Sequence, residues 1–179
     1  MTERKFDIVK MILAFCLAAI VGPIISKAFT SFDAHHAALA ESRARALVLH
    51  DRLIEAGANR VFWARRILQK INTEQANAIE TLPYADYDRS VATWSATVSS
   101  GLRTIEKTYP SDIWEKFAKL NSDLGKLNTI TRWQISDLTK HGNAGNQTEN
   151  IKEAARLADL IIEVSYEMQI FINSDDFSN

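Results

Sequence analysis

The sequence predicts an all-α protein, in which an N-terminal single transmembrane helix is followed by an antiparallel (up-down) four-helix bundle with long helices. Three observations lead to this fold class. The 179 residues include only 6 Gly and 3 Pro, so few breaks interrupt the chain. Apolar residues recur at helical spacing through the body of the protein. Finally, the segment between Lys10 and Lys27 contains no charged residue.

We interpret the uncharged segment as a membrane anchor that the mature protein retains. A transmembrane helix needs about 20 apolar residues. The span reaches this length when it is counted from about Ile8 to Phe29, because Lys10 and Lys27 can extend to the lipid headgroups. The residues assigned to the anchor are Met11, Ile12, Leu13, Phe15, Leu17, Ile20, Val21, Pro23, Ile24 and Ile25.

Three other interpretations of this segment stay open. A cleavable signal peptide fits the basic start and apolar centre, and Ser26-Lys27-Ala28 has the small-x-small pattern of a cleavage site. A lipoprotein signal would use Cys16, although the preceding Phe15 is larger than such signals require. A buried core helix would have a polar side, which this segment lacks. Cys16 is the single cysteine, so no intrachain disulfide can form.

The charge distribution predicts the orientation of the anchor and argues against one class of partner. Residues 1–27 carry 4 basic and 2 acidic residues, whereas the remainder carries 17 basic and 20 acidic residues. Basic residues ahead of the span favour a cytoplasmic N-terminus and a body outside, in a bacterial periplasm, with a cytoplasmic body as the alternative. The mildly acidic body argues against nucleic-acid binding. We expect residues 1–33 to form the N-terminus and anchor, and residues 34–179 the bundle.

The first helix of the body is predicted from about residue 34 to residue 81. Its apolar residues follow a heptad, which is typical of a helix that packs closely on its neighbours. The heptad consists of Leu47, Ile54, Val61 and Leu68, and only Gln75 interrupts its continuation to Leu82. Gly57 belongs to a second stripe of mostly small residues. We interpret it as a point of close packing, with a helix break as the alternative.

Three further helices are predicted between clear breaks. Pro83 ends the first helix, and the second extends over about residues 86–108. Pro110 starts the third helix, which runs to about residue 140 and has capping-box spacing at Asp112. A loop follows in which Gly142 is placed to end a helix. The fourth helix, capped by Thr148 or Asn146, runs to about residue 173.

The fourth helix is apolar over more than one stripe. A core-facing helix in a small bundle needs only about 100° of apolar surface. The excess indicates either a central position or a second interface, for a protein partner or a second copy. Glu163 and Glu167 argue against a second membrane span. The candidate interface comprises Leu157, Leu160, Ile161, Val164, Met168 and Phe171.

Several polar residues have both a functional and a structural interpretation. Tyr84, Asp86 and Tyr87 lie at a predicted turn and form either a recognition tip or solvated capping groups. The adjacent histidines 35 and 36 point about 100° apart on a helix, so they do not predict a metal site. His50 falls on the apolar stripe and is interpreted as a satisfied core or boundary histidine, with pH sensing as the alternative.

No catalytic residue, metal ligand or cofactor is predicted. The sequence lacks a Gly-rich phosphate loop and a GxSxG elbow, and Cys16 lies within the predicted anchor. We interpret the helix-spaced tryptophans as core residues, with an inter-helix ligand pocket as the alternative. They are Trp63, Trp94, Trp114 and Trp133.

The layout resembles the ligand-binding bundle of bacterial chemoreceptors, in which an entering anchor is followed by four helices. Here no second span or signalling domain follows, so a transmitted signal would need a partner. The first hypothesis is a non-enzymatic, single-pass membrane protein whose bundle binds a protein partner or self-associates at the membrane surface. The alternatives are a small-molecule sensor and a membrane-active effector or lysis accessory protein.

Overall fold

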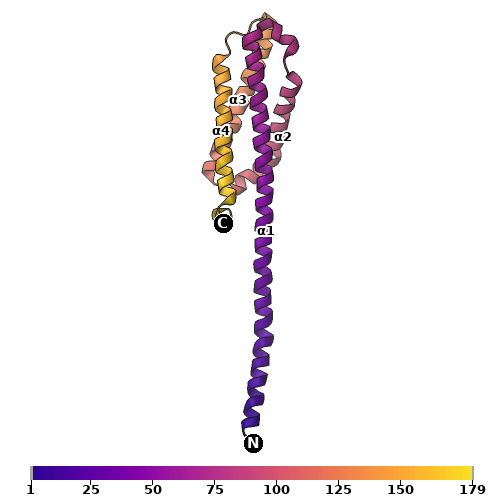
Figure 1. Ribbon diagram of the computed structural model, residues 1–179, viewed down its shortest axis with the longest axis vertical. Helices are drawn as coiled ribbons and strands as arrows, with labels where there is room; N and C mark the ends of the chain where they lie inside the picture. Colours follow the sequence, from indigo (N-terminus) through magenta and orange to yellow (C-terminus); the bar gives the residue numbers. More distant parts are fainter. Residues whose placement is uncertain (1, 179) are drawn as a thin grey trace. The chain divides into compact units, whose positions relative to one another are not determined.

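The computed structural model describes the backbone of residues 2–178 and the side chains of residues 27–177, except residues 28, 29 and 76. The described backbone contains four α-helices, two 3-10 segments and no β-strand (Figure 1). The α-helices are α1 (Thr2–Glu74), α2 (Tyr84–Thr108), α3 (Ser111–His141) and α4 (Thr148–Asn173), and the 3-10 segments are η1 (Gln75–Thr81) and η2 (Asp175–Ser178). The prediction of an all-α helical bundle is confirmed.

The chain divides into two compact units, Met1–Ala44 and Arg45–Asn179. The second unit contains the bundle, to which α1 contributes its residues from 45 onward. Where side chains are described, no helix has both the length and the apolar composition that a bilayer crossing requires. The residues assigned to the anchor, between positions 11 and 25, lie outside those described side chains, so the anchor stays a prediction.

The helix ends follow local sequence signals. Helix α1 ends where Gln75, which interrupts the heptad, takes a positive φ of 49°. Pro83 and Pro110 stand directly before α2 and α3, where a residue without an N–H leaves no donor unsatisfied. Gly142 has a φ of 69°, and its N–H donates to the carbonyl oxygen of Leu138 at 2.8 Å. This left-handed cap confirms the predicted end of the third helix.

The capping predictions had different outcomes at α3 and α4. The capping box expected at Asp112 is not formed, because the N-cap of α3 is Pro110, two residues earlier, and it has no side-chain cap hydrogen bond. Asp112 therefore lies in the first turn, where its charge faces the positive end of the helix dipole. At α4 the N-cap is Gln147, without a side-chain cap hydrogen bond, so neither Thr148 nor Asn146 is the N-cap that was predicted. The Asn146 side chain still accepts a hydrogen bond from the backbone N–H of Thr148 at 2.8 Å.

Neighbouring helices of the bundle run in opposite directions. Between α2 and α3, the Tyr87 hydroxyl donates to Asn128 and the Trp94 indole donates to Asn121. Residue numbers thus rise along one helix as they fall along the other. The ion pairs between α3 and α4 show the same reversal. Between α1 and α4, His50 contacts Ser165 whereas Gly57 approaches Ile161, so these two helices are antiparallel as well (Figure 1).

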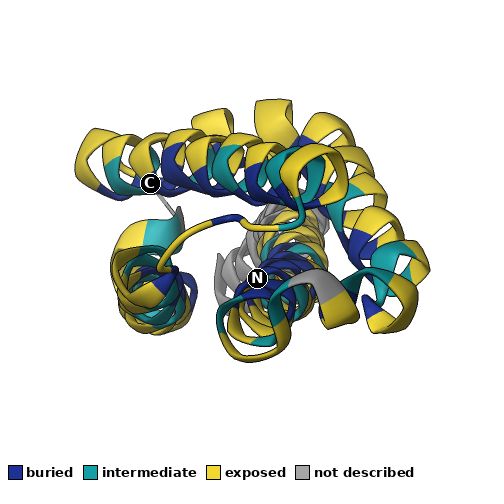
Figure 2. Cartoon of the chain, turned by 90° about the horizontal axis from the view of Figure 1, so that it is seen from above, coloured by how far each residue is buried: buried dark blue, intermediate teal, exposed yellow. Residues whose placement is uncertain are grey.

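The core lies between the four helices, whose buried residues face inward (Figure 2). Trp94 is among its largest fully buried side chains. Helix α1 continues through Gly57, where an added Cβ would lie 3.1 Å from the Trp94 ring and 3.3 Å from Ile161. The interpretation of Gly57 as a point of close packing is therefore confirmed. Side chains from α2 and α4 meet α1 at this glycine.

Two glycine substitutions should change stability in opposite directions. Gly57→Leu places a side chain where Trp94 and Ile161 already pack, and overpacking of this kind costs about 1–3 kcal/mol. Gly125 is exposed within α3 with no atom near its Cβ position, so Gly125→Ala should stabilise the protein by about 0.5–1 kcal/mol. Chemical denaturation of the detergent-solubilised chain measures both effects. A Gly57→Leu variant with the same free energy of unfolding as wild type would contradict close packing of Trp94 and Ile161 at this position.

Candidate functional site

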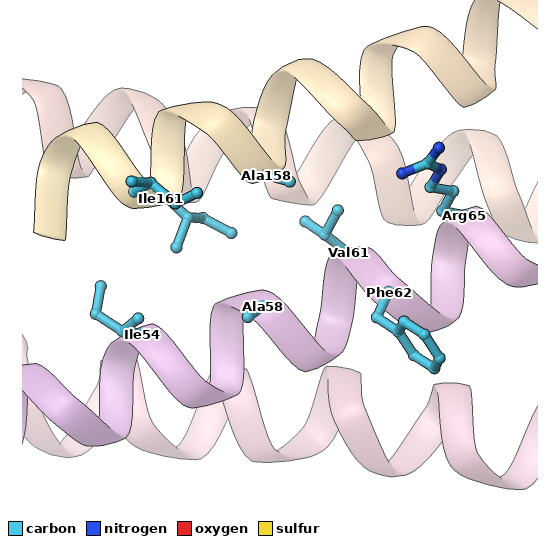
Figure 3. A pocket seen from close by; sticks show the side chains of 8 residues that line it. Ile54, Ala58, Val61, Phe62, Arg65, Ala158 and Ile161 are labelled. Atoms are coloured by element: carbon cyan, nitrogen blue, oxygen red, sulfur yellow. The ribbon is translucent and has the colours of Figure 1, made fainter.

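A surface groove lies between α1 and α4 (Figure 3). Its volume is about 260 Å³. The α1 side chains that line it are spaced three and four residues apart, which places them on one helix face. Ala58 and Ala158 lie on opposite sides of the gap and are too small to fill it. The complete lining is Ile54, Ala58, Val61, Phe62, Arg65, Ala158, Ile161 and Ile162.

The edges of this groove are apolar and exposed. Phe62 of α1 is 52% exposed and Ile162 of α4 is 66% exposed. Tyr166 and Ile170 continue the exposed row along α4 at four-residue spacing. We refer to Ile162, Tyr166 and Ile170 as the α4 stripe. A row of large exposed apolar side chains beside an apolar groove is typical of an interaction surface.

Arg65 is the only charged residue that lines the groove. It forms no ion pair with any residue whose side chain is described. The neighbouring Arg66 has a different environment, since its guanidinium carbon lies 6.0 Å from the centre of the Trp63 ring. The groove therefore combines an apolar lining with one cation that is available for an external partner.

His50 links α1 to α4 along the same helix pair. It is 6% exposed, and its Nε2 lies 3.0 Å from Ser165 Oγ and 3.1 Å from the Ser165 carbonyl oxygen. Its Nδ1 lies 3.0 Å from Asp51 Oδ1. Both ring nitrogens thus have protein partners, as expected of a satisfied buried histidine. A pH-sensing role stays a hypothesis.

A polar cluster inside the bundle involves Arg60 of α1. Arg60 is buried and donates to the carbonyl oxygen of Leu124 at 2.7 Å. Burial lowers the pKa of Arg60, because desolvation disfavours its charged form. Nearby, the Tyr87 hydroxyl donates to Asn128 Oδ1 at 2.7 Å, and burial raises the pKa of Tyr87. These bonds tie α3 to α1 and α2, so we interpret the cluster as structural.

Most of the residues in the predicted α4 interface lie in the core. Leu157, Ile161, Val164 and Met168 are buried, and Leu160 and Phe171 are half-buried against them. An interface through the four buried residues would require the bundle to open, and that prediction stays untested. The excess of apolar residues on α4 instead leaves the α4 stripe in solvent.

The three residues of the predicted recognition tip lie in the first turn of α2. Tyr84 and Asp86 are half-buried, and Asp86 lies 3.6 Å from Arg89 in an ion pair. Burial raises the pKa of Tyr84. Tyr87 is buried in the core, where its hydroxyl is bonded to Asn128. The structure therefore leaves only part of this cluster accessible, and its recognition role stays a prediction.

The tryptophans were predicted to be core residues, and the structure separates them. Trp94 is buried, and Trp63 and Trp114 are half-buried against the core. Trp133 is 62% exposed, so the prediction was wrong for this residue. The buried series of α3 at seven-residue spacing, Ile113, Leu120 and Leu127, continues to Gln134, so the adjacent Trp133 lies outside the inward-facing stripe. The adjacent histidines 35 and 36 lie in the first unit, where their rings pack edge to face. The described residues contain no group of three or more His, Cys, Asp or Glu side chains that could hold a metal ion.

The seam between α3 and α4 is held by charges. Asp123 is buried and accepts hydrogen bonds from Lys126 at 2.8 Å and from Arg156 at 3.2 Å. The hydrogen bond from Lys126 is the largest cause of the lowered pKa of Asp123, and the Arg156 guanidinium adds to it. Lys116 pairs with Glu167 on the same seam.

No protein family model, curated protein or solved structure matches this chain. The α1–α4 groove is the candidate site because it combines a concave apolar lining, exposed apolar edges and an unpaired cation. Ile162 belongs to the apolar excess that was predicted on α4. Phe62 and Arg65 were not predicted, although Phe62 follows Ala58 by four residues and Arg65 follows Phe62 by three.

Stability should depend on the ionisation of Asp123. Because its pKa is lowered on folding, the charged form stabilises the folded state above the unfolded pKa of about 3.9, and this contribution is lost as pH falls through the folded value. Asp123→Asn should lower the thermal midpoint at pH 7 by about 2–4 °C, and the difference from wild type should shrink as pH falls below the unfolded pKa of about 3.9 and through the lower folded pKa. Asp159→Asn, at an exposed position, is the control. A pH-independent difference would contradict this assignment.

Proposed function

We propose that this chain is a non-enzymatic, single-pass membrane-anchored helical-bundle protein that binds a protein partner or self-associates at the membrane surface. The observation that carries the proposal is the exposed apolar surface formed by Phe62 and the α4 stripe around the groove. Isolated surface hydrophobic residues need no explanation, but a contiguous row beside a concavity does. A covering partner would remove these side chains from water, which supplies the driving force for association.

The membrane part of the proposal rests on the sequence. The stretch between Lys10 and Lys27 has no charge, and basic residues precede it. A helix of this composition is stable in hydrocarbon, because its backbone hydrogen bonds are internal and its side chains are apolar. The excess of basic residues ahead of the span supports a cytoplasmic N-terminus and an external body.

The mechanism would be presentation of a binding surface. An anchor confines the bundle to the membrane plane and so raises its effective concentration toward partners in the same membrane. A modest apolar surface is then sufficient for association, because the anchor has already removed much of the translational entropy that would otherwise be lost on binding. The sequence has no Gly-rich phosphate loop and no GxSxG elbow. The hydroxyl of Ser165 does lie 3.0 Å from His50 Nε2, but His50 is buried between α1 and α4 and 6% exposed, so we favour a binding role over a chemical one.

Membrane retention should depend on the anchor. We expect the full chain to stay in the membrane pellet during alkaline carbonate extraction. The double variant Leu17→Arg/Ile20→Arg should move to the supernatant, because each arginine at the centre of a span costs about 2.5–3.5 kcal/mol. Ala92→Arg/Ala96→Arg, at exposed positions of α2, is the matched control. Release of the wild-type protein, or a mature N-terminus near residue 29, would contradict the anchor.

Association should depend on the α4 stripe. Amine-reactive cross-linking of the full chain in native membranes should give a specific adduct. Ile162→Glu should reduce this adduct at least about tenfold, since a charge would be placed in a desolvated contact. Leu102→Glu is the control, because Leu102 is an exposed apolar residue of α2 outside the stripe. Equal adducts in wild type and Ile162→Glu, or equal losses in both variants, would argue against the proposed surface.

A further inference from the structure

The dimensions of the α1–α4 groove restrict what can occupy it. Its volume of about 260 Å³ lies just below the roughly 300–1,000 Å³ of typical small-molecule pockets. A small molecule of that size would fill the depression but leave the outer surfaces of Phe62 and Ile162 in water. A helix is about 10 Å across, so it could insert side chains into the groove and cover both edges. The groove and its exposed edges together favour a helix.

A second copy of this chain is a less suitable occupant. An isologous dimer uses the same surface on both copies. If this surface were centred on the groove, one concavity would face another, and the space beside Ala58 and Ala158 would stay unfilled. A convex helix from a different protein fills it directly, as in other helix-in-groove complexes.

The charge at the groove specifies the partner further. Arg65 is the single cation of the lining and is unpaired among the described side chains. A partner helix with a carboxylate beside its apolar stripe would form a charge-assisted hydrogen bond with this guanidinium. A basic residue at the same position would meet like charge.

We propose that the α1–α4 groove binds an amphipathic helix of a protein partner, with large apolar side chains inserted between Ala58 and Ala158 and an acidic side chain paired with Arg65. This assignment rests on the proposed binding function and names the partner class. The edges formed by Phe62 and Ile162 pack along the flanks of the bound helix. Arg65 selects acidic helices over basic ones.

The test uses the full chain in phosphatidylcholine nanodiscs and two fluorescent helical peptides of about 18 residues, long enough to form a helix on binding. Both peptides carry the same leucine stripe. One has a glutamate beside the stripe and the other a lysine at that position. Fluorescence anisotropy, corrected with empty nanodiscs, should show saturable binding of the glutamate peptide at least about tenfold tighter than that of the lysine peptide.

Two variants, each with a matched control, locate the binding. Arg65→Glu should reverse the preference between the peptides, whereas Arg66→Glu, beside Trp63, should leave it unchanged. Ala158→Leu should fill the groove and weaken the binding of both peptides at least about tenfold. Ala118→Leu, at an exposed α3 position, should leave the binding of both unchanged. Circular dichroism confirms that each variant folds. Arg65→Glu changes an exposed side chain, so it tests the proposal even if Ala158→Leu misfolds.

The opposite outcomes overturn the proposal. Peptide binding no stronger than to empty nanodiscs, or an unchanged preference in Arg65→Glu, removes the acidic-helix assignment. A self-association in analytical ultracentrifugation that Ala158→Leu abolishes assigns the groove to a second copy instead. The Ile162-dependent adduct in membranes distinguishes a failure of the proposed binding function from a failure of the partner class alone. If it persists while both peptides fail to bind, the binding function stands and only the partner class is wrong.

Discussion

The bundle depends on the close approach of three helices at Gly57. An ordinary side chain at this position of α1 would meet both the Trp94 ring from α2 and Ile161 from α4. Trp94 extends the contact to α3, because its indole donates to Asn121 at 2.9 Å and its ring lies 6.1 Å from that of Phe117. One glycine thus allows a large aromatic side chain to touch three neighbours at once, and the energy of this contact comes from burial of the ring.

The same use of small residues creates the candidate site. At Gly57 the space left by a missing side chain is filled by Trp94, so the helices pack tightly. One residue further along α1, Ala58 lies across the gap from Ala158 of α4, and these two small side chains leave part of the space between the helices unfilled. Small residues therefore draw the helices together on the inner face and leave a depression on the outer one. The groove follows directly from the close approach and needs no distortion of either helix.

The sequence predicted the helices better than their surfaces. Pro83, Pro110 and Gly142 act through fixed φ, a missing donor or a left-handed cap, all of which are local effects, so the starts of α2 and α3 and the end of α3 were predictable. The end of α1 was not: it was predicted near residue 81, whereas α1 ends at Glu74 and a 3-10 segment continues to Thr81. Which stripe of a helix faces solvent depends on where its neighbours lie, and periodicity alone does not specify this. Phe62 and Arg65 were therefore not recognised as groove residues. Trp133 was assigned to the core for its aromatic character alone, although the buried series of α3 runs through the adjacent Gln134. The interface predicted on α4 was drawn through residues that the other helices bury.

The two seams of α4 differ in the forces that hold them, and this difference determines where a partner can bind. Toward α3, α4 is fixed by ion pairs of Asp123 with Arg156 and of Lys116 with Glu167. Toward α1, the polar contact is the bond of His50 to Ser165, and the groove beside it is apolar. A partner at the α3 seam would have to displace satisfied charges, which is costly. At the α1 seam it would displace water from a largely apolar surface, so the α1 side of α4 is the more favourable place for a partner to bind.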